Sequence, residues 1–333
     1  MDRNPELLLA FNRLPGHRGR LKRRLVDACR DDGDLSAAVE AYAASVSPRT
    51  ARRIPVEPQL LREAAADLRR MKATGMEVSF LGDDDYPEIL ARIYDPPFAL
   101  FRRGAADFAG KPAVAVVGTR RPTMSAHRQS YRIAMEFASA GYPVVSGLAF
   151  GVDRAAHEGA LAAPGATWAV LAGGLDRPSP AAHRRLAYRI LERGGALIGE
   201  MPPGTFPEKH AFPRRNRILS GLCRGCVVVQ APARSGALIT ADFALEQDRD
   251  LYVASSGLEG PCGDGTRRLE EQGAPVVEDA SDVLSDWGRF LDIGKVKELR
   301  EPCGPEELVR RMRSELDGHL HRYMGGSFEY RSS

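Results

Sequence analysis

Ala-Val-Ala-Val-Val-Gly-Thr-Arg-Arg-Pro, residues 113–122, is the stretch that decides the fold. Its five small apolar residues are typical of a strand that is buried on both faces. Gly118 then allows the backbone to approach a ligand closely, and a helix is expected to begin near Ser125. Unpaired N–H groups at that helix start, together with the guanidinium group of Arg120, favour phosphate binding. Taken alone, the loop is more typical of a tight turn with a surface arginine.

The same alternation of strand and helix continues on the C-terminal side. Strands are expected at 113–117, 143–145, 167–171, 196–198, 226–230 and 250–253, and helices at 125–140, 153–161, 181–193, 214–222 and 238–247. This order predicts βαβ units and an α/β fold, an extended Rossmann-like, doubly wound, mostly parallel sheet with helices on both faces. Ligands of such sheets bind at the carboxyl ends of the strands.

The segments on either side of this region differ in character. Residues 1–75 are expected to form a small helical domain with a turn at Leu14-Pro15-Gly16, and residues 76–290 the Rossmann domain. Residues 291–333 are expected to form a short helical extension, with an amphipathic helix from Glu306 to Tyr323 and a frayed tail.

Composition restricts the class of protein but names no activity. The chain has 333 residues, 43% hydrophobic and 27% charged, which is ordinary for a soluble globular protein. No apolar run is long enough for a membrane span, and five cysteines, an odd number, favour a reducing compartment, so a cytoplasmic location is expected. The net charge of +3 is uninformative, but residues 18–24 hold five basic side chains. A solvated helix face explains them most simply, and a DNA contact is the alternative.

Two further loops at strand ends are rich in glycine. Ser146 and Gly147 follow the second strand, and Asp153 is expected to be the N-cap of the next helix. His157 has no metal-binding or nucleophilic neighbours in the sequence, so a core or surface histidine is expected. Ser235 and Gly236 begin a later helix and resemble an anion-binding nest.

The most specific segment is Arg214-Arg215-Asn216-Arg217. Cations near a helix N-terminus oppose the helix dipole and cost stability, unless a bound anion offsets them. The segment therefore indicates an anion-binding site. Cys223 and Cys226 form a CxxC pair without a second pair, so buried, inert cysteines are expected and no metal site is predicted. The first loop lacks the later glycines of the dinucleotide fingerprint, so no nicotinamide cofactor is expected either.

Together these loops resemble the DNA-processing protein A (DprA or Smf) family. The matching motifs are Val117-Gly118-Thr119-Arg120, Ser146-Gly147-Leu148-Ala149-Phe150-Gly151-Val152-Asp153, Gly173-Gly174-Leu175-Asp176, Phe212-Pro213-Arg214-Arg215-Asn216-Arg217 and Ser235-Gly236-Ala237-Leu238-Ile239-Thr240-Ala241. The resemblance covers roughly residues 76–280, and residues 1–75 look like the family's small helical (SAM-like) domain. The segment after 292 is too short for the complete winged helix that many members carry.

The resemblance implies a function in recombination and no catalysis. It implies single-stranded DNA binding, dimerisation, protection of incoming DNA and loading of the RecA recombinase in natural transformation. The residues expected to contact DNA are Gly118, Arg120, Ser146, Gly147, Arg214, Asn216, Arg217, Ser235 and Gly236. The sequences after Asp176 and Val253 depart from the family pattern, which leaves the shape of the groove open.

Two other functions remain open at this point. Lonely Guy phosphoribohydrolases have a related Rossmann fold and a catalytic glutamate directly after a glycine loop. Here the first glutamate after Ser235-Gly236 is Glu246. A nucleotide-sensing module is the third candidate, because glycine loops suit a mononucleotide as well as single-stranded DNA. Phe150, Phe206 and Phe212 flank these loops and are candidates for base stacking or for ordinary apolar packing.

Overall fold

The computed structural model describes residues 4–16, 19–28 and 35–288, and three short strands at 296–299, 320–323 and 326–330. One nine-stranded sheet has the order β1-β2-β6-β5-β4-β3-β7-β8-β9. Its strands are β1 Met76–Phe80, β2 Ala99–Gly104, β3 Ala113–Val117, β4 Val144–Ser146, β5 Thr167–Val170, β6 Ala196–Gly199, β7 Cys223–Val228, β8 Asp250–Ala254 and β9 Val276–Val277. The pairs from β6 to β9 are parallel, and β1 and β2 are antiparallel. The predicted mostly parallel α/β fold is confirmed.

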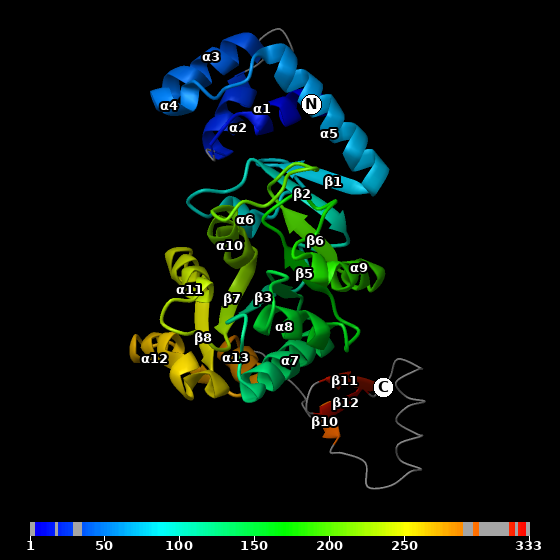
Figure 1. Ribbon diagram of the computed structural model, residues 1–333, viewed down its shortest axis with the longest axis vertical. Helices are drawn as coiled ribbons and strands as arrows, with labels where there is room; N and C mark the ends of the chain where they lie inside the picture. Colours follow the sequence, from blue (N-terminus) through cyan, green and yellow to red (C-terminus); the bar gives the residue numbers. More distant parts are fainter. Residues whose placement is uncertain are drawn as a thin grey trace.

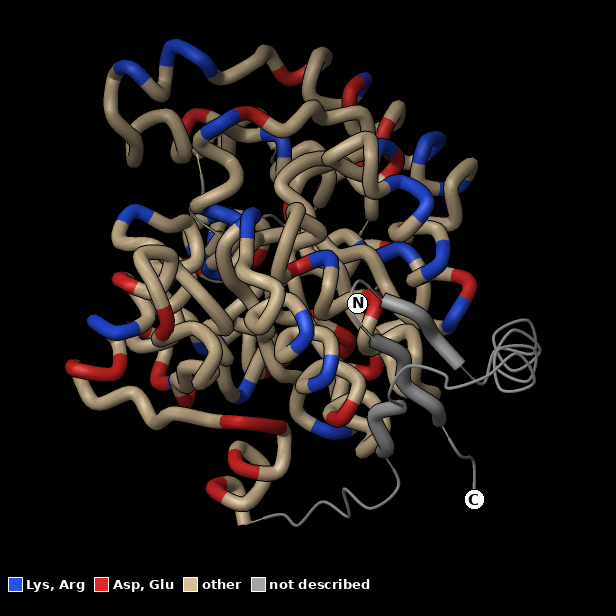
Figure 2. The backbone as a smooth tube through the Cα atoms, turned by 60° about the horizontal axis from the view of Figure 1, so that its bottom comes forward, with Lys and Arg blue, Asp and Glu red and all other residues tan. Residues whose placement is uncertain are grey.

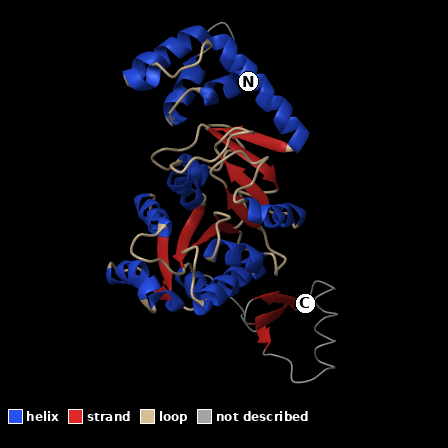
Figure 3. Cartoon of the chain, viewed as in Figure 1, coloured by secondary structure: helices blue, strands red, loops and turns tan. Residues whose placement is uncertain are grey.

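Helices cover both faces of this sheet (Figures 1 and 3). The described helices of this part are α6 Glu88–Ala91, α7 Met124–Ser139, α8 Val152–Ala160, α9 Arg184–Glu192, α10 Ala211–Gly221, α11 Gly236–Glu246, α12 Asp264–Glu271 and α13 Ala280–Asp286. Val114 and Val116 of β3 pack with residues of α7, α8 and α13, whereas Ala115 and Val117 pack with residues of α10, α11 and α12. Alternate side chains of one strand thus enter two cores, as expected for a doubly wound sheet.

The N-terminal residues form the predicted helical domain. Its helices are α1 Pro5–Arg13, α2 Gly19–Ala28, α3 Leu35–Ser45, α4 Pro48–Ala51 and α5 Glu57–Thr74. Gly75, at a φ of 63°, ends α5 in the left-handed conformation that glycine adopts easily. One hydrophobic core joins this domain to the sheet, because Leu9 and Phe11 of α1 belong to the same cluster as Phe101 and Leu197. No described helix is long and apolar enough to cross a membrane.

Two arginines of the basic run, Arg20 and Arg23, attach the helical domain to the sheet domain. Arg20 donates to the carbonyl oxygens of Ala91 and Ile93, both at 3.0 Å, and Arg23 donates to the carbonyl oxygen of Leu81 at 2.7 Å. A β-carbon on Gly19 would lie 2.1 Å from the carbonyl oxygen of Pro96, so the backbones meet closely there. Arg20 is exposed as expected and Arg23 is half-buried, and both side chains also bind backbone carbonyl oxygens of the sheet domain.

The C-terminal extension differs from the expected helix. The described residues form a small antiparallel sheet of β10 Val296–Leu299, β12 Gly326–Tyr330 and β11 Leu320–Tyr323, in that order. Strand β11 occupies the end of the helix predicted from Glu306 to Tyr323, and β12 occupies part of the expected tail. The rest of that predicted helix lies outside the described residues.

Candidate functional site

The strand order identifies one crevice as the natural ligand position. From β3, the chain builds β4, β5 and β6 on one side and β7, β8 and β9 on the other, so the winding direction changes between β3 and β7. In open α/β sheets, ligands bind at this topological switch point, outside the carboxyl ends of the strands. Gly118 follows β3 there, and the N–H of Thr119 donates to the carbonyl oxygen of Gln230 at 2.7 Å. This bond joins the loops after β3 and β7.

Exposed arginines surround this position, which is called the switch-point site below. Arg120 and Arg121 extend from the β3–α7 loop, and Arg234 extends from the β7–α11 loop. None of these three guanidinium groups has a hydrogen bond or an ion pair within the described part of the chain. Lys, Arg, Asp and Glu residues are distributed over the described backbone (Figure 2). The exposed cations at this site are therefore more informative about a ligand than the net charge of +3.

Ser235 and Gly236 form the start of α11 at the same site. The Ser235 hydroxyl is the N-cap and accepts a hydrogen bond from the N–H of Ala237 at 3.2 Å. Gly236 is exposed, and a β-carbon there would have no atom within 4 Å. The side-chain amide of Asn216 donates to the Gly236 carbonyl oxygen at 3.2 Å, which fixes the loop against α10. An anion could therefore reach the free N–H groups of this helix end.

Arg215 holds the neighbouring loops together from inside. Its side chain is buried and donates to the carbonyl oxygen of Gly147 at 3.0 Å and to that of Val170. Burial lowers the pKa of Arg215 to about 10, which the carboxylate of Asp153 opposes and Arg120 reinforces. The guanidinium group remains charged at neutral pH and links the carboxyl ends of β4 and β5.

Asp153 shapes the loop after β4 and is not the predicted N-cap. The N-cap of α8 is Gly151, which has no side chain for capping. The Asp153 carboxylate instead accepts the N–H groups of Gly147 at 3.0 Å and Ala149 at 3.3 Å. Burial raises the pKa of this carboxyl group, which Arg215 and the two N–H groups oppose. The sequence spacing suits a cap equally well, so only the fold distinguishes the two roles.

Two of the predicted site residues point away from the crevice. The Ser146 hydroxyl is fully buried and donates to the carbonyl oxygen of Val116 at 2.7 Å. Arg217 is also buried, with ion pairs to Glu200 and, at 3.3 Å, to Asp95. Arg214 is half-buried, and its guanidinium group lies 3.9 Å from Glu200. The cations of α10 thus find internal partners, so the expected need for an external anion at this helix start is met within the protein.

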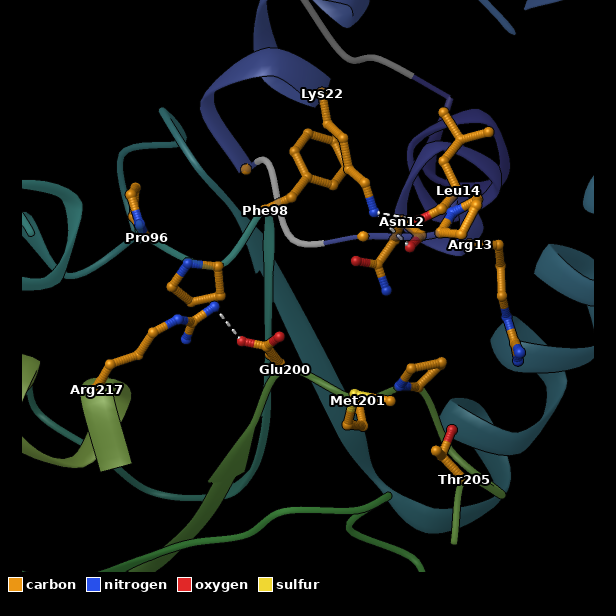
Figure 4. Close-up of a pocket in the computed structure, with 15 residues that line it drawn as sticks. Asn12, Arg13, Leu14, Lys22, Pro96, Phe98, Glu200, Met201, Thr205 and Arg217 are labelled. Carbon is orange, nitrogen blue, oxygen red and sulfur yellow. Dashed lines mark hydrogen bonds and ion pairs between the residues drawn. The ribbon is translucent and has the colours of Figure 1, made fainter. Parts of the chain in front are cut away.

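A cavity of about 260 Å³ lies beside Arg217, between the helical domain and the sheet domain (Figure 4). Lys22 from α2 and Glu200 after β6 line it, together with Pro96 and Phe98. The Lys22 ammonium group is buried and donates to the carbonyl oxygens of Asn12 at 3.0 Å and Leu14 at 2.6 Å. Burial lowers its pKa to about 8, although Glu200 and Asp95 oppose the shift. The cavity therefore lies where the helical domain meets the sheet domain. Its lining includes none of Arg120, Arg121, Arg234 and Gly236 of the switch-point site.

The DNA recombination-mediator protein A family matches residues 77–288, which is more than half of the chain. The chain belongs to this family. It is 36% identical over 230 residues to DNA processing protein DprA of Bacillus subtilis, covering 69% of this chain and 76% of that protein. The crystal structure of DprA from Streptococcus pneumoniae is similar to this chain, with a TM-score of 0.67 and 30% identity, over 86% of this chain and 99% of the other.

A second similar structure is of a DprA protein described for its DNA binding. DNA processing protein A of Helicobacter pylori, described for its single-stranded DNA binding mode, has a TM-score of 0.56 and 29% identity, and covers 63% of this chain and 95% of that chain. These relatives confirm the resemblance to the DprA family that the sequence motifs indicate.

Other predictions for this DprA family member concern residues away from the site. His157, expected to be a core or surface histidine, is a core one, fully buried with its Nδ1 2.8 Å from the Thr167 hydroxyl. Cys223 and Cys226 are buried free thiols, and burial raises the pKa of both, which fits inert side chains. Among the described residues, no cluster of His, Cys, Asp and Glu could hold a metal ion. Sequence reasoning missed Gln230, whose side chain accepts the N–H of Thr123 at 2.9 Å.

Proposed function

We propose that this member of the recombination-mediator family binds single-stranded DNA at the switch-point site and presents it to the RecA recombinase. The observation that carries the proposal is the group of unpaired, exposed guanidinium groups of Arg120, Arg121 and Arg234 around the open helix start at Gly236. Exposed cations and free N–H groups suit a chain of phosphates. The binding mode described for the Helicobacter pylori relative supports the same ligand.

The expected site residues take different parts in this proposal. Arg120 and Ser235 would contact phosphate oxygens through their side chains, and Gly118 and Gly236 through the nearby backbone, whereas Arg214 lies beside Glu200. The remaining members, Gly147, Asn216, Ser146 and Arg217, would hold the loops in position from inside the fold.

A salt titration with a labelled oligonucleotide tests the DNA proposal. Affinity should fall steeply with salt, because each phosphate contact releases a counterion and lowers the slope of log K against log salt by about 0.7. Arg120→Glu should reduce affinity by at least about tenfold, as expected for losing a charge-assisted contact of about 1.5 kcal/mol. Arg53→Glu, on an exposed residue of the helical domain, is the matched control. Tight, salt-insensitive binding of AMP without DNA binding would favour the nucleotide-sensing module instead.

An enzyme of the phosphoribohydrolase type finds no support at the glycine loop. Glu246 is exposed at the far end of α11, about 15 Å from Gly236 by the helical rise per residue. A glutamate so placed is too far from the loop to act there, and the nearer carboxylate, about 9 Å along the helix, is Asp242 and not a glutamate.

The partners of the proposed function are RecA and a second copy of the chain, in natural transformation or DNA uptake. RecA loading predicts that the protein speeds RecA-dependent strand exchange on DNA already coated with a single-strand-binding protein. Arg120→Glu should lose this stimulation. Light scattering should give twice the mass of one chain, and the mass of one chain would contradict the dimer.

A further inference from the structure

Helix α9 carries a row of arginines that the switch-point site does not include. Arg185, Arg189 and Arg193 follow one another at every fourth position, and Arg184 lies beside the first. All four are exposed, while Leu186 and Ile190 face the core. The row from Arg185 to Arg193 runs about 12 Å along the helix.

These arginines differ from surface arginines that pair within their own helix or turn. Arg92, Arg154 and Arg267 each pair with a carboxylate three or four positions away on their own helix or turn. By contrast, the four arginines of α9 and its C-cap form no hydrogen bond or ion pair through their side chains with the described part of the chain.

The sequence of α9 is unfavourable for an isolated helix. Like charges four positions apart repel each other, as Arg185 and Arg189 do, and cations in the first turn oppose the helix dipole. Glu192 is the single acidic residue of α9. An external polyanion along the row would reverse each of these costs.

The row begins next to the switch-point site. A β-carbon on Gly151 would lie within 2.7 Å of the backbone of Arg120, which places the β4–α8 loop against the β3–α7 loop. The exposed ring of Phe150 in that loop lies 4.4 Å, between ring centroids, from His183, the residue before Arg184. The β4–α8 loop therefore contacts both the backbone of Arg120 and the residue that precedes α9.

An exposed aromatic ring lies on the same helix. Tyr188 is 44% exposed, and the guanidinium group of Arg103 lies 5.7 Å from the centre of its ring. Single-stranded nucleic acids are held by cationic grooves with aromatic rings on which bases stack. Helix α9 exposes both kinds of side chain.

We propose that the arginine row of α9 is a second phosphate-binding segment, along which a single DNA strand continues beyond the switch-point site. This inference rests on the proposed function, because it extends the same DNA path. A short oligonucleotide would occupy the switch-point site alone, and a longer one would also cover α9. The two segments can therefore be separated by the length of the strand.

The test compares two triple variants with two strand lengths. The first variant combines Arg185→Gln, Arg189→Gln and Arg193→Gln. The control combines Arg49→Gln, Arg52→Gln and Arg53→Gln, which removes the same charge from exposed positions at α4 in the helical domain (Figure 1). Oligothymidylates of about 6 and about 20 nucleotides bracket the usual site size of a single-strand-binding domain. Anisotropy is measured over a range of salt, and thermal melts verify folding.

The α9 variant should bind the short strand as the wild type does and the long strand at least about tenfold more weakly, with a salt slope smaller by about 2 for three lost contacts. The control variant should bind both strands normally. Unchanged binding of the long strand by the α9 variant, or an equal loss in the control, overturns the inference and leaves the proposed function intact. Wild-type protein that binds neither strand overturns the proposed function, and the inference with it.

Discussion

Arg215 and Gly147 lie 68 positions apart, and the Arg215 guanidinium group donates a 3.0 Å hydrogen bond to the Gly147 carbonyl oxygen. The N–H of the same glycine donates to the carboxylate of Asp153 at 3.0 Å. A buried cation and a buried anion thus hold the two peptide units that flank the Gly147 Cα. The loop beneath the candidate DNA path is therefore fixed by the interior of the protein before any ligand binds.

Replacing Arg215 with methionine should destabilise the fold. The change leaves the carbonyl oxygens of Gly147 and Val170 without their donor and the buried Asp153 carboxylate without a nearby cation, and each buried polar group left without a partner costs about 1 to 3 kcal/mol. Urea denaturation should show this loss in the free energy of unfolding. Arg120→Met, on an exposed arginine at the same site, should change it by less than about 0.5 kcal/mol. Equal stabilities of the two variants would contradict the assigned role of Arg215.

Lys22 should make stability rise with pH in the alkaline range. Its pKa is lowered from 10.5 to about 8 in the folded protein, so between these values the unfolded chain holds a proton that the folded chain has released. The free energy of unfolding therefore increases over this window, by about 3 kcal/mol at most. Lys22→Met should remove this increase, whereas Lys72→Met, at an exposed position, should retain it. The comparison needs urea denaturation at several pH values from 7 to 11, and parallel curves for all three proteins would refute it.

Glu136 should have the opposite effect near neutral pH. Its carboxylate accepts the N–H of Ala280 at 2.9 Å, and burial raises its pKa from 4.5 to about 7. The folded chain holds the extra proton between these values, so the free energy of unfolding falls as pH rises through them. The glutamine of Glu136→Gln cannot ionise. The free energy of unfolding of this variant, relative to that of the wild type, should therefore be higher at pH 8 than at pH 5 by roughly 2 to 3 kcal/mol. Glu271→Gln, at an exposed position, should give the same small difference at both pH values.

The central strands were predictable because burial on both faces leaves a simple signal. The expected strand at 113–117 matches β3 residue for residue, and the other predicted strands of the parallel sheet overlap β4 to β8. Strand β2 was missed, since Ala99-Leu100-Phe101 is followed by Arg102 and Arg103 and lies between antiparallel neighbours outside the βαβ pattern. Period and composition thus identify the strands of the core, whereas the charged second half of β2 hides it.

The candidate site was only partly predictable because a motif gives residue types and not directions. Consecutive residues of a helix point about 100° apart, so Arg215, Asn216 and Arg217 reach three environments. Arg215 binds the strand ends, Asn216 binds Gly236, and Arg217 pairs with Glu200. Sequence reasoning treated them as one anion-binding group. Arg217→Glu places a carboxylate beside those of Glu200 and Asp95 and should therefore lower the melting temperature.

Two glycines of the candidate site should respond in opposite ways to alanine. At Gly147, a β-carbon would lie 2.5 Å from the Arg215 guanidinium group and 2.7 Å from the Asp153 carboxylate, so Gly147→Ala must displace both buried groups. At Gly236, the added methyl group meets no atom within 4 Å. There, alanine should stabilise the protein by about 0.4 to 1 kcal/mol, because it restricts the unfolded chain.

Measurements of DNA affinity then distinguish the structural role of Gly147 from the DNA contact proposed for Gly236. If a phosphate approaches the start of α11, the methyl group of Gly236→Ala occupies that space, and affinity for a short oligonucleotide should fall while the melting temperature is kept or raised. Gly147→Ala should lower the melting temperature by several degrees, since a loss of about 1 kcal/mol shifts it by about 2 to 4 °C in a chain of this size. Normal DNA affinity in Gly236→Ala would place the phosphate path away from the α11 start.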